Sequence, residues 1–376
     1  MVPPSAHQSV SRLLLAVALL TTLLVTPSGD APSFACSPTT ADIGPSVPGP
    51  QAPTPVSVSE KLFGVGIAGG EFTANRLPGT LGTDYIYPTS SERLQYFADH
   101  GLTLVRVPFL WERVQPRPFE PLSTPDLDGL RAVLAAAAAN HQKVILDLHN
   151  YGRYYGKPLG RSDAASFADF WGRFARAMAG QSGLFGYELM NEPHDLPDGS
   201  QGWAYLSQVA TNAIRESDRT SWVLVPGYGW QSASLWPENN QTLDVRDPAG
   251  RLLYAAHEYF DRDGSGTYAR SYAADGANPC LGVQRLQPFL KWLDQRNALG
   301  ILTEYGVPGN DPRWLDVLDR FLQALNADPR IVGGTYWPAG PWWGNYPLSV
   351  EPSDGQDRPQ AAILFRYPSR PVRQSR

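Results

Sequence analysis

Cysteine is scarce in this chain: Cys36 and Cys280 are its two cysteines among 376 residues. Two cysteines cannot build the disulfide framework of a small secreted domain, and no C-x-x-C pair is present to bind zinc. One bridge between the two is chemically possible. Because Cys36 lies in a segment with the composition of a linker, we expect the two thiols to remain unpaired.

Charge and metal-binding motifs are equally sparse. Charged residues make up 18% of the chain and the net charge is −5, so there is no basic stripe to attract nucleic acid. His257-Glu258 lacks the second histidine of a zinc-protease motif, and the loop that begins at Asp261 lacks the distal glutamate of a calcium loop. We therefore expect no metal and no cofactor. Nothing in the sequence indicates a protein partner, so we expect a monomer.

The longest apolar run lies near the N-terminus. Residues 13–25 are apolar apart from two threonines, which is too short to span a bilayer comfortably. Arg12 precedes the run, and Ser33-Phe34-Ala35 fits the small-x-small pattern of a cleavage site. We predict that residues 1–35 are a secretion signal and that the protein is extracellular. A membrane anchor is the alternative interpretation.

A lipid anchor on Cys36 is a further alternative, because Ala35-Cys36 matches the last pair of a lipobox, although Ser33 and Phe34 fit that motif poorly. Residues 36–58 are rich in Pro, Ser and Thr, a composition that predicts an extended linker. We expect residues 59–370 to form a single domain and residues 371–376 a short tail.

From Glu60 onward, short apolar runs typical of buried strands alternate with longer runs of helical period. Eight such strands with intervening helices over about 300 residues predict an α/β fold, the (β/α)8 or TIM barrel. An open doubly wound sheet would need a helix directly after the G-x-G-x-x-G string at residues 64–69, but Gly70, Thr73 and Pro78 indicate a loop. The predicted strands are 62–67, 104–107, 144–148, 184–189, 222–226, 253–257, 300–303 and 332–337, and the predicted helices are 91–100, 126–140, 164–179, 202–217, 283–297 and 314–326.

Two of the predicted strands lead into a glutamate. The apolar run 185–190 is followed by Asn191, Glu192 and Pro193, and proline ends a central strand because it has no N–H for the ladder. The run 300–303 is followed by Glu304. The carboxyl ends of the strands form the catalytic edge of a parallel barrel. Two glutamates there predict acid/base or nucleophilic chemistry on a glycosidic bond.

Aromatic side chains are plentiful, with 11 tryptophans and 17 tyrosines. Their flat faces suit the apolar face of a sugar ring, so aromatic residues near strand ends are candidate sugar platforms. Packing on the rim of the barrel is the alternative for each. The candidates in loops are Trp111, Trp230, Trp342 and Trp343, and the further residues at strand ends are Arg106, His149, Asn150, His257, Tyr259 and Trp337.

Together these residues resemble glycoside hydrolase family 5, within the clan of retaining (β/α)8 glycosidases, over residues 62–366. Two further strings are similar to the cellulase branch of that family: the one from His149 to Tyr154 and Trp230-Gln231-Ser232-Ala233. The family-like strings are Arg-x-Pro-Phe-x-Trp-Glu from Arg106, Asp-Leu-His-Asn-Tyr from Asp147, Asn-Glu-Pro from Asn191, His-Glu-Tyr-Phe-Asp from His257 and Leu-Thr-Glu-Tyr-Gly from Leu302.

The resemblance implies that Glu192 is the acid/base and Glu304 the nucleophile, with carboxyls about 5–5.5 Å apart. We expect Arg106 to lower the pKa of Glu304, and burial beside a like charge to keep Glu192 protonated. The resemblance also implies that substrate contacts come from Arg106, His149, Asn150, Asn191, His257, Tyr259, Trp337, Trp342, Trp343 and Trp111.

Other carboxyls are expected in supporting positions. We expect Glu188 and Asp147 to be structural, and Glu258 to point out of the barrel because it alternates with His257. Glu71 and Glu112 are expected to contact substrate or to orient Arg106.

The implied activity is that of a secreted endo-1,4-β-glucanase whose partner is a β-1,4-linked glucan chain. Three alternatives remain open: the same chemistry on mannan, xyloglucan or mixed-linkage glucan, transglycosylation, and a non-catalytic glycan-binding barrel.

Overall fold

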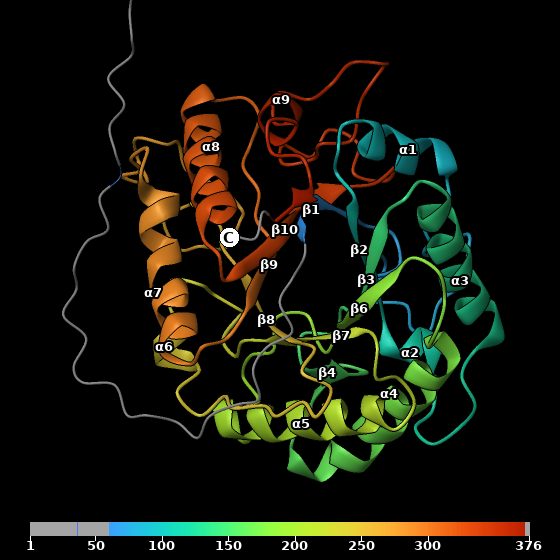
Figure 1. Cartoon of the computed structure of the whole chain (residues 1–376). Coiled ribbons are helices and arrows are strands. Elements are labelled where there is room, and N and C mark those ends of the chain that lie inside the picture. The colour runs from blue at the N-terminus through green and yellow to red at the C-terminus, as the bar shows by residue number, and fades with distance from the viewer. Residues whose placement is uncertain (1–35, 37–59, 373–376) are drawn as a thin grey trace, which may run out of the picture. The chain divides into compact units, whose positions relative to one another are not determined.

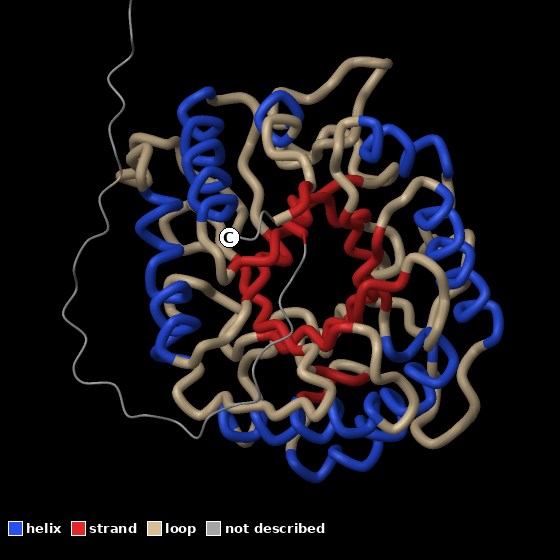
Figure 2. Tube along the Cα trace, in the orientation of Figure 1, coloured by secondary structure: helices blue, strands red, loops and turns tan. Residues whose placement is uncertain are grey.

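The computed structural model describes Cys36 and residues 60–372. Eight parallel strands form a closed ring in which the last strand pairs with the first (Figures 1 and 2). The predicted (β/α)8 barrel is therefore confirmed. The barrel strands are β1 (Glu60–Ile67), β2 (Leu104–Phe109), β3 (Lys143–Leu148), β6 (Leu184–Glu188), β7 (Trp222–Pro226), β8 (Leu252–His257), β9 (Gly300–Glu304) and β10 (Ile331–Ala339).

Helices surround this ring as an outer layer (Figure 2). The long ones are α1 (Ser91–Asp99), α3 (Thr124–Ala139), α4 (Ala164–Met178), α5 (Gly199–Arg215), α7 (Leu281–Gln295) and α8 (Pro312–Ala327). Short elements complete the described chain: α2 (Trp111–Val114), β4 (Arg153–Tyr154), β5 (Lys157–Pro158), η1 (Arg161–Asp163), α6 (Trp236–Asn239), α9 (Ala361–Leu364) and β11 (Arg370–Pro371). All six predicted helices are present, and their ends differ from the predicted ones by at most three residues.

Alternation along the strands divides the barrel interior into an apolar and a polar layer. Leu104 and Ile301 belong to a cluster of apolar residues at the amino end of the strands. Two residues further along, the same alternation turns Arg106 and Thr303 inward, where both are fully buried among polar groups. The apolar layer thus supports a polar site directly above it. Its members are Leu62, Leu104, Ile145, Phe185, Trp222, Leu224, Leu253, Ala255, Ile301 and Val332.

The glycine string in the first strand has a packing role. Residues 64–67 lie within β1, so the string is no phosphate loop. A Cβ atom on Gly66 would lie 2.7 Å from the ring of Trp337, closer than real Cβ atoms approach. Gly66 therefore makes room for the indole of Trp337 at the carboxyl edge of the barrel.

Cys36 and Cys280 form a disulfide, with Cα atoms 5.4 Å apart. The expectation of free thiols is wrong, because the composition of the residues after Cys36 does not determine where Cys36 itself is held. A sulfur in a disulfide is not available for a thioether, so this form of the protein carries no lipid on Cys36.

The predicted secretion signal (1–35) and the predicted linker after Cys36 lie outside the described residues. Within the described part, no helix has both the length and the apolar character needed to cross a membrane. Arg370 and Pro371 pair with Lys61 and Glu60 at the start of β1, so the barrel sheet extends one residue into the predicted tail.

Candidate active site

Arg106 lies at the centre of the polar layer and is fully buried. Its Nε donates to Glu188 at 2.6 Å, and its Nη2 donates to Asn191 Oδ1 at 2.8 Å and pairs with Asp147 at 3.0 Å. Its Nη1 donates to Glu304. The structural role expected for Glu188 and Asp147 agrees with these contacts, because both carboxylates hold the guanidinium that reaches Glu304.

Glu304 ends strand β9 and is contacted by two donors. Oε1 accepts from Arg106, and Oε2 accepts from the Tyr259 hydroxyl at 2.9 Å. Burial raises the pKa of Glu304, while Arg106 and the Tyr259 hydrogen bond lower it. The expected lowering by Arg106 is thus present, but burial is the larger effect and the net shift of the pKa is upward.

Glu192 follows strand β6 and is held by its backbone. Its φ is +43°, in the left-handed region, and its N–H donates to Gln231 Oε1 at 2.7 Å. Its carboxyl Oε1 lies 2.9 Å from Nδ1 of His257. Burial and then the negative charge of Glu304 raise the pKa of Glu192 well above its usual range. Glu192 is therefore the group of the pair that keeps its proton.

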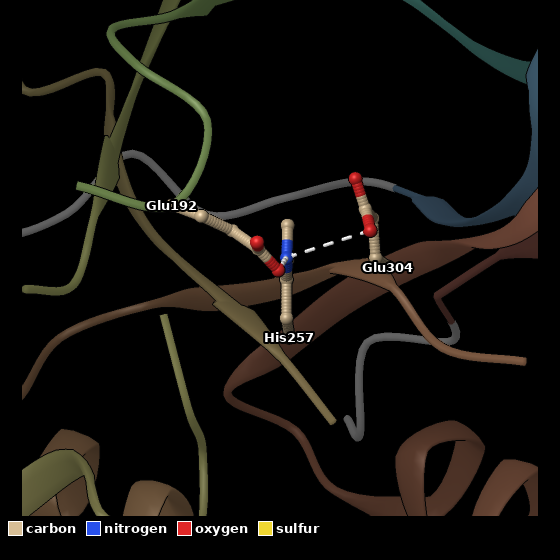
Figure 3. Close-up of side chains that lie close together, drawn as sticks. All are labelled: Glu192, His257 and Glu304. Atoms are coloured by element: carbon tan, nitrogen blue, oxygen red, sulfur yellow. Dashed lines mark hydrogen bonds and ion pairs between the residues drawn. The ribbon is translucent and has the colours of Figure 1, made fainter. Parts of the chain in front are cut away.

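The two carboxyls face each other across a short gap, with His257 beside them (Figure 3). A carboxyl oxygen of Glu192 and one of Glu304 lie within 4.8 Å, and His257 Nδ1 is 3.7 Å from Glu304 Oε2. The burial of His257 and the charge of Arg106 hold the pKa of His257 well below its usual range. This arrangement places one acid, one base and a neutral imidazole next to one another.

The same three side chains have the spacing of a small cation site, since their ligand atoms all lie within 4.8 Å. Arg106 already contacts Glu304 and neutralises it. The proton on Glu192 further reduces the negative charge available to a cation. The electrostatics therefore suit proton transfer better than metal binding.

Aromatic side chains that pack against one another form a wall beside Glu304. The ring of Trp337 stacks at 5.6 Å from His149, and Arg106 lies 5.9 Å from the Trp337 centroid. Trp343 packs edge-on against Trp337 at 5.9 Å and stacks on Tyr346 at 4.8 Å. The indole N–H of Trp343 is buried and has no hydrogen-bond partner among the described residues. Trp342 is 43% exposed on the same side.

Two predicted substrate contacts are misplaced. Trp111 is fully buried, with its N–H on Gln115 and its ring against Phe167 and Phe170, so it cannot meet a sugar. The prediction failed because a tryptophan at a strand end can pack under the adjoining helix as readily as it can face the cleft.

Asn150 is the second misplaced contact. Its side-chain oxygen accepts from the backbone N–H of Trp111 at 2.8 Å, and its side-chain nitrogen donates to Glu112 at 2.7 Å, so both ends of the amide are committed. Glu112 accepts from Asn150 and from the N–H of Tyr155. Glu112 therefore fixes the loop after β3 and does not orient Arg106.

A second exposed tryptophan lies on the other side of Glu192. Trp230 is 51% exposed and stacks on His194 at 4.2 Å with an interplanar angle of 13°. His194 was not among the predicted site residues, but its Nδ1 lies 2.8 Å from the carbonyl oxygen of Glu192.

Glu258 pairs with Arg285 on the outer helix α7 and so points away from the interior, as predicted.

Two residues that hold the site were missed from the sequence. Gln231 accepts from the Glu192 N–H and donates to Glu188 at 3.1 Å, while Thr303 Oγ1 lies between His257 and Glu188. Both stand inside family-like strings, beside Trp230 and Glu304 respectively. Their position next to assigned residues was the signal, but uncharged side chains gave no reason to assign them a role.

A (β/α)8 barrel with two facing glutamates at its carboxyl edge has the architecture of a glycoside hydrolase. The chain matches the family described as cellulase (glycosyl hydrolase family 5) over residues 63–340. It therefore belongs to glycosyl hydrolase family 5.

Individual relatives agree with that assignment. An endo-beta-1,4-glucanase B of Emericella nidulans is 32% identical over 297 residues, which cover 78% of this chain and 87% of the relative. The endoglucanase Cel5A of Pseudomonas stutzeri, solved with cellobiose, is 40% identical with a TM-score of 0.77, covering 83% of this chain and 94% of that one. An endo-beta-1,4-glucanase of Xanthomonas axonopodis pv. citri is 37% identical with a TM-score of 0.76, covering 82% and 98%.

Proposed function

We propose that this enzyme is a retaining endo-1,4-β-glucanase in which Glu304 is the nucleophile and Glu192 the acid/base. One observation carries the proposal: a carboxyl oxygen of buried Glu304 and one of partly buried Glu192 lie within 4.8 Å and have opposite surroundings, one on Arg106 and one on neutral His257. A gap of this size holds the anomeric carbon but leaves no room for a water between base and sugar, as an inverting enzyme requires.

In the first step, an oxygen of Glu304 attacks the anomeric carbon and the glycosidic C–O bond breaks. Glu192 transfers its proton to the departing oxygen, and the sugar is left esterified to Glu304. Arg106 and Tyr259 keep Glu304 ionised and aimed before the attack. The pKa of Glu192 is raised most while Glu304 is charged, so Glu192 is protonated when a proton is needed.

In the second step, the ester no longer carries the negative charge that raised the pKa of Glu192. Glu192, now ionised, takes a proton from a water whose oxygen attacks the anomeric carbon. The ester bond to Glu304 breaks and its carboxylate is restored. The two roles of Glu192 thus follow from the charge on its neighbour.

Other residues bind the sugar in this proposal. Asn191 uses its Oδ1 on Arg106 at 2.8 Å, which leaves its amide N–H groups for the 2-hydroxyl of the sugar. Trp337 supplies a flat floor beside Glu304, and His149, held by Asp147 at 2.6 Å, lies next to it. Trp342 and Trp343 extend the wall in the direction of the same sugar chain.

The test is to follow the anomeric protons of the products by NMR during early turnover of cellopentaose. Retention gives β-anomer first, which then mutarotates, whereas initial α-anomer contradicts the double displacement. Initial rates on carboxymethyl cellulose, mannan, xyloglucan and mixed-linkage glucan test the substrate. A faster rate on mannan or xyloglucan than on the cellulose derivative would replace glucanase by one of those activities.

We also propose that the enzyme is secreted and acts as a monomer. The Cys36–Cys280 disulfide supports secretion, since such bonds persist in oxidising compartments. All of the site residues come from one barrel, so one chain holds a complete site. Intact mass of the culture-supernatant protein, before and after reduction, measures both the cleavage site and the bridge. A chain retained in the cytosol with residues 1–35 intact would contradict secretion.

A further inference from the structure

The position of the proton on the His257 imidazole determines whether Glu192 faces a hydrogen-bond donor or an acceptor. Neutral imidazole has one ring nitrogen that donates and one that accepts, and the partner of each nitrogen selects the tautomer. Nδ1 of His257 lies 2.9 Å from Glu192 Oε1, and Nε2 lies 3.1 Å from Thr303 Oγ1. The ring is 2% exposed and packed from both ends, so it has no freedom to turn over.

Thr303 selects between the two tautomers because its hydroxyl has a single proton. Oγ1 lies 2.7 Å from Glu188 Oε1. Glu188 is an acceptor on both oxygens: Oε2 receives the Nε–H of Arg106 at 2.6 Å, and Oε1 also receives Gln231 Nε2 at 3.1 Å. Burial raises the pKa of Glu188, but the charge of Arg106 and the hydrogen bonds from Arg106 and Thr303 oppose that shift and favour the carboxylate. The geometry therefore directs the Thr303 proton to Glu188, which accepts from the guanidinium and the Gln231 amide as well. Toward His257, the hydroxyl of Thr303 can then only accept.

We infer that the Glu188–Thr303 pair holds His257 as the Nε2–H tautomer and so turns a bare Nδ1 toward Glu192. In its consequence for turnover this inference rests on the proposed acid/base role of Glu192. A protonated carboxyl can donate to a bare nitrogen, whereas an ionised carboxylate there gains no hydrogen bond and meets a lone pair. Thr303 is therefore a positioning residue: it acts through the imidazole to favour the protonated form of Glu192.

Replacing Thr303 by valine isolates this effect. The variant keeps the shape of the side chain and removes the hydroxyl, so Nε2 loses its hydrogen-bond acceptor and the nearest carboxylate oxygen, Glu188 Oε1, is 4.0 Å away. The ring is then free to carry its proton on Nδ1 and to donate to Glu192, which stabilises the carboxylate. The other groups facing Glu192 and His257 stay in place: Arg106 on β2, Asp147 on β3, His149 and Tyr151 after β3, Glu188 on β6, Tyr259 after β8 and Glu304 on β9.

The first readout is the pH dependence of kcat/KM on a cello-oligosaccharide. In Thr303→Val we expect the alkaline limb to move to lower pH by about one unit, because a new donor favours the ionised acid. Thr303→Ser keeps the hydroxyl and should keep the wild-type limb. Thr335→Val is the matched control, since Thr335 is an equally buried threonine on β10 whose hydroxyl donates to the Thr303 carbonyl at 2.6 Å. It should lose stability comparably and leave the limb in place.

The second readout does not depend on catalysis. Nitrogen-15 NMR of histidine-labelled enzyme distinguishes Nδ1–H from Nε2–H, and the chain has six histidines, so His257→Gln assigns the signals. We expect Nε2–H in the wild type and in Thr303→Ser, and a switch to Nδ1–H in Thr303→Val. An Nδ1–H ring in the wild type overturns the inference whatever the enzyme hydrolyses. A switch of the ring with an unmoved alkaline limb supports the tautomer assignment and contradicts the acid role of Glu192.

Discussion

The surroundings of the two glutamates differ although both side chains lie at the same edge of the barrel. Glu304 lies at the end of regular strand β9 and accepts from Arg106 and Tyr259. Glu192 lies beyond the end of β6 at a φ of +43° and contacts the imidazole of His257. One carboxyl thus meets a permanent cation and a hydroxyl donor, and the other meets a neutral ring.

The backbone differs between the two sides as well. Loops after β3, β6 and β7 hold several non-glycine residues at positive φ: Tyr151, Tyr155, Glu192, Asp195, Trp230 and Gln231. From β9 to the end of β10 no described non-glycine residue has a positive φ. Each left-handed residue costs about 1 kcal/mol or more, so the surrounding packing must hold Glu192 in place. Glu304 needs no such support because it lies at the end of a regular strand.

The largest test of this contrast is to remove each carboxyl in turn. In Glu304→Ala we expect kcat to fall about 10⁵-fold on every substrate, since no covalent intermediate can form. In Glu192→Ala we expect a loss of about 10²–10⁴-fold on cello-oligosaccharides and a much smaller loss on dinitrophenyl cellobioside, whose leaving group needs no proton. Steady-state rates on the two substrates measure the difference.

Azide is the control for these two variants. In Glu192→Ala, azide should accelerate turnover and give a β-cellobiosyl azide, because it replaces water at the intermediate without needing a base. In Glu304→Ala, any azide product should have the α-configuration, since azide then attacks the substrate directly. The reverse pattern would exchange the two assignments.

A smaller effect is expected from Arg106→Lys, which weakens the feature that distinguishes Glu304. One ammonium cannot reach Glu188, Asp147, Asn191 and Glu304 together, as the guanidinium does. With less positive charge near Glu304 its pKa rises, so the acid limb of kcat/KM should move to higher pH, and kcat/KM should fall by about 10²-fold. A pH profile from acid to neutral measures both.

Arg113→Lys is the matched control for this variant. Arg113 is also buried, but its guanidinium donates to the carbonyls of Gly70 and Phe72 instead of to carboxylates. It should cost stability without moving the acid limb. An equal displacement of that limb in both variants would mean that Arg106 acts only by holding the fold.

The amino-acid sequence predicts the barrel well because strand alternation and proline leave a local record. Pro193 marks the end of the run that leads to Glu192, and alternation with His257 places Glu258 outside the barrel. The facing glutamates are predictable for the same reason, since parallel strands bring their carboxyl ends to one edge.

Properties that depend on distant packing left no such record. Trp111 is adjacent to a strand end, but helix α4 covers it through Phe167 and Phe170. Cys36 is followed by linker-like residues, yet its partner is 244 residues away. The net pKa direction of Glu304 is the outcome of burial opposed by Arg106, and only the second of these is visible in a motif. Gln231 and Thr303 are uncharged, so their roles appear only as distances.

The smallest expected effect separates the two sides of the cleft through their exposed tryptophans. Trp230 stacks on His194 beside Glu192, whereas Trp342 lies 5.8 Å from Phe72 on the side of Trp337. We expect Trp230 to stack on the part of the sugar chain that leaves in the first step. Trp230→Ala should then raise KM for cellopentaose about 10-fold through lost stacking. The change should be smaller for an aryl cellobioside, which leaves this side of the cleft empty. Trp342→Ala should raise KM for both substrates, because both fill the side of Glu304. The two indoles are similarly exposed. Equal effects on the two substrates in both variants would therefore show that Trp230 and Trp342 do not contact the parts of the sugar chain on opposite sides of the glutamate pair.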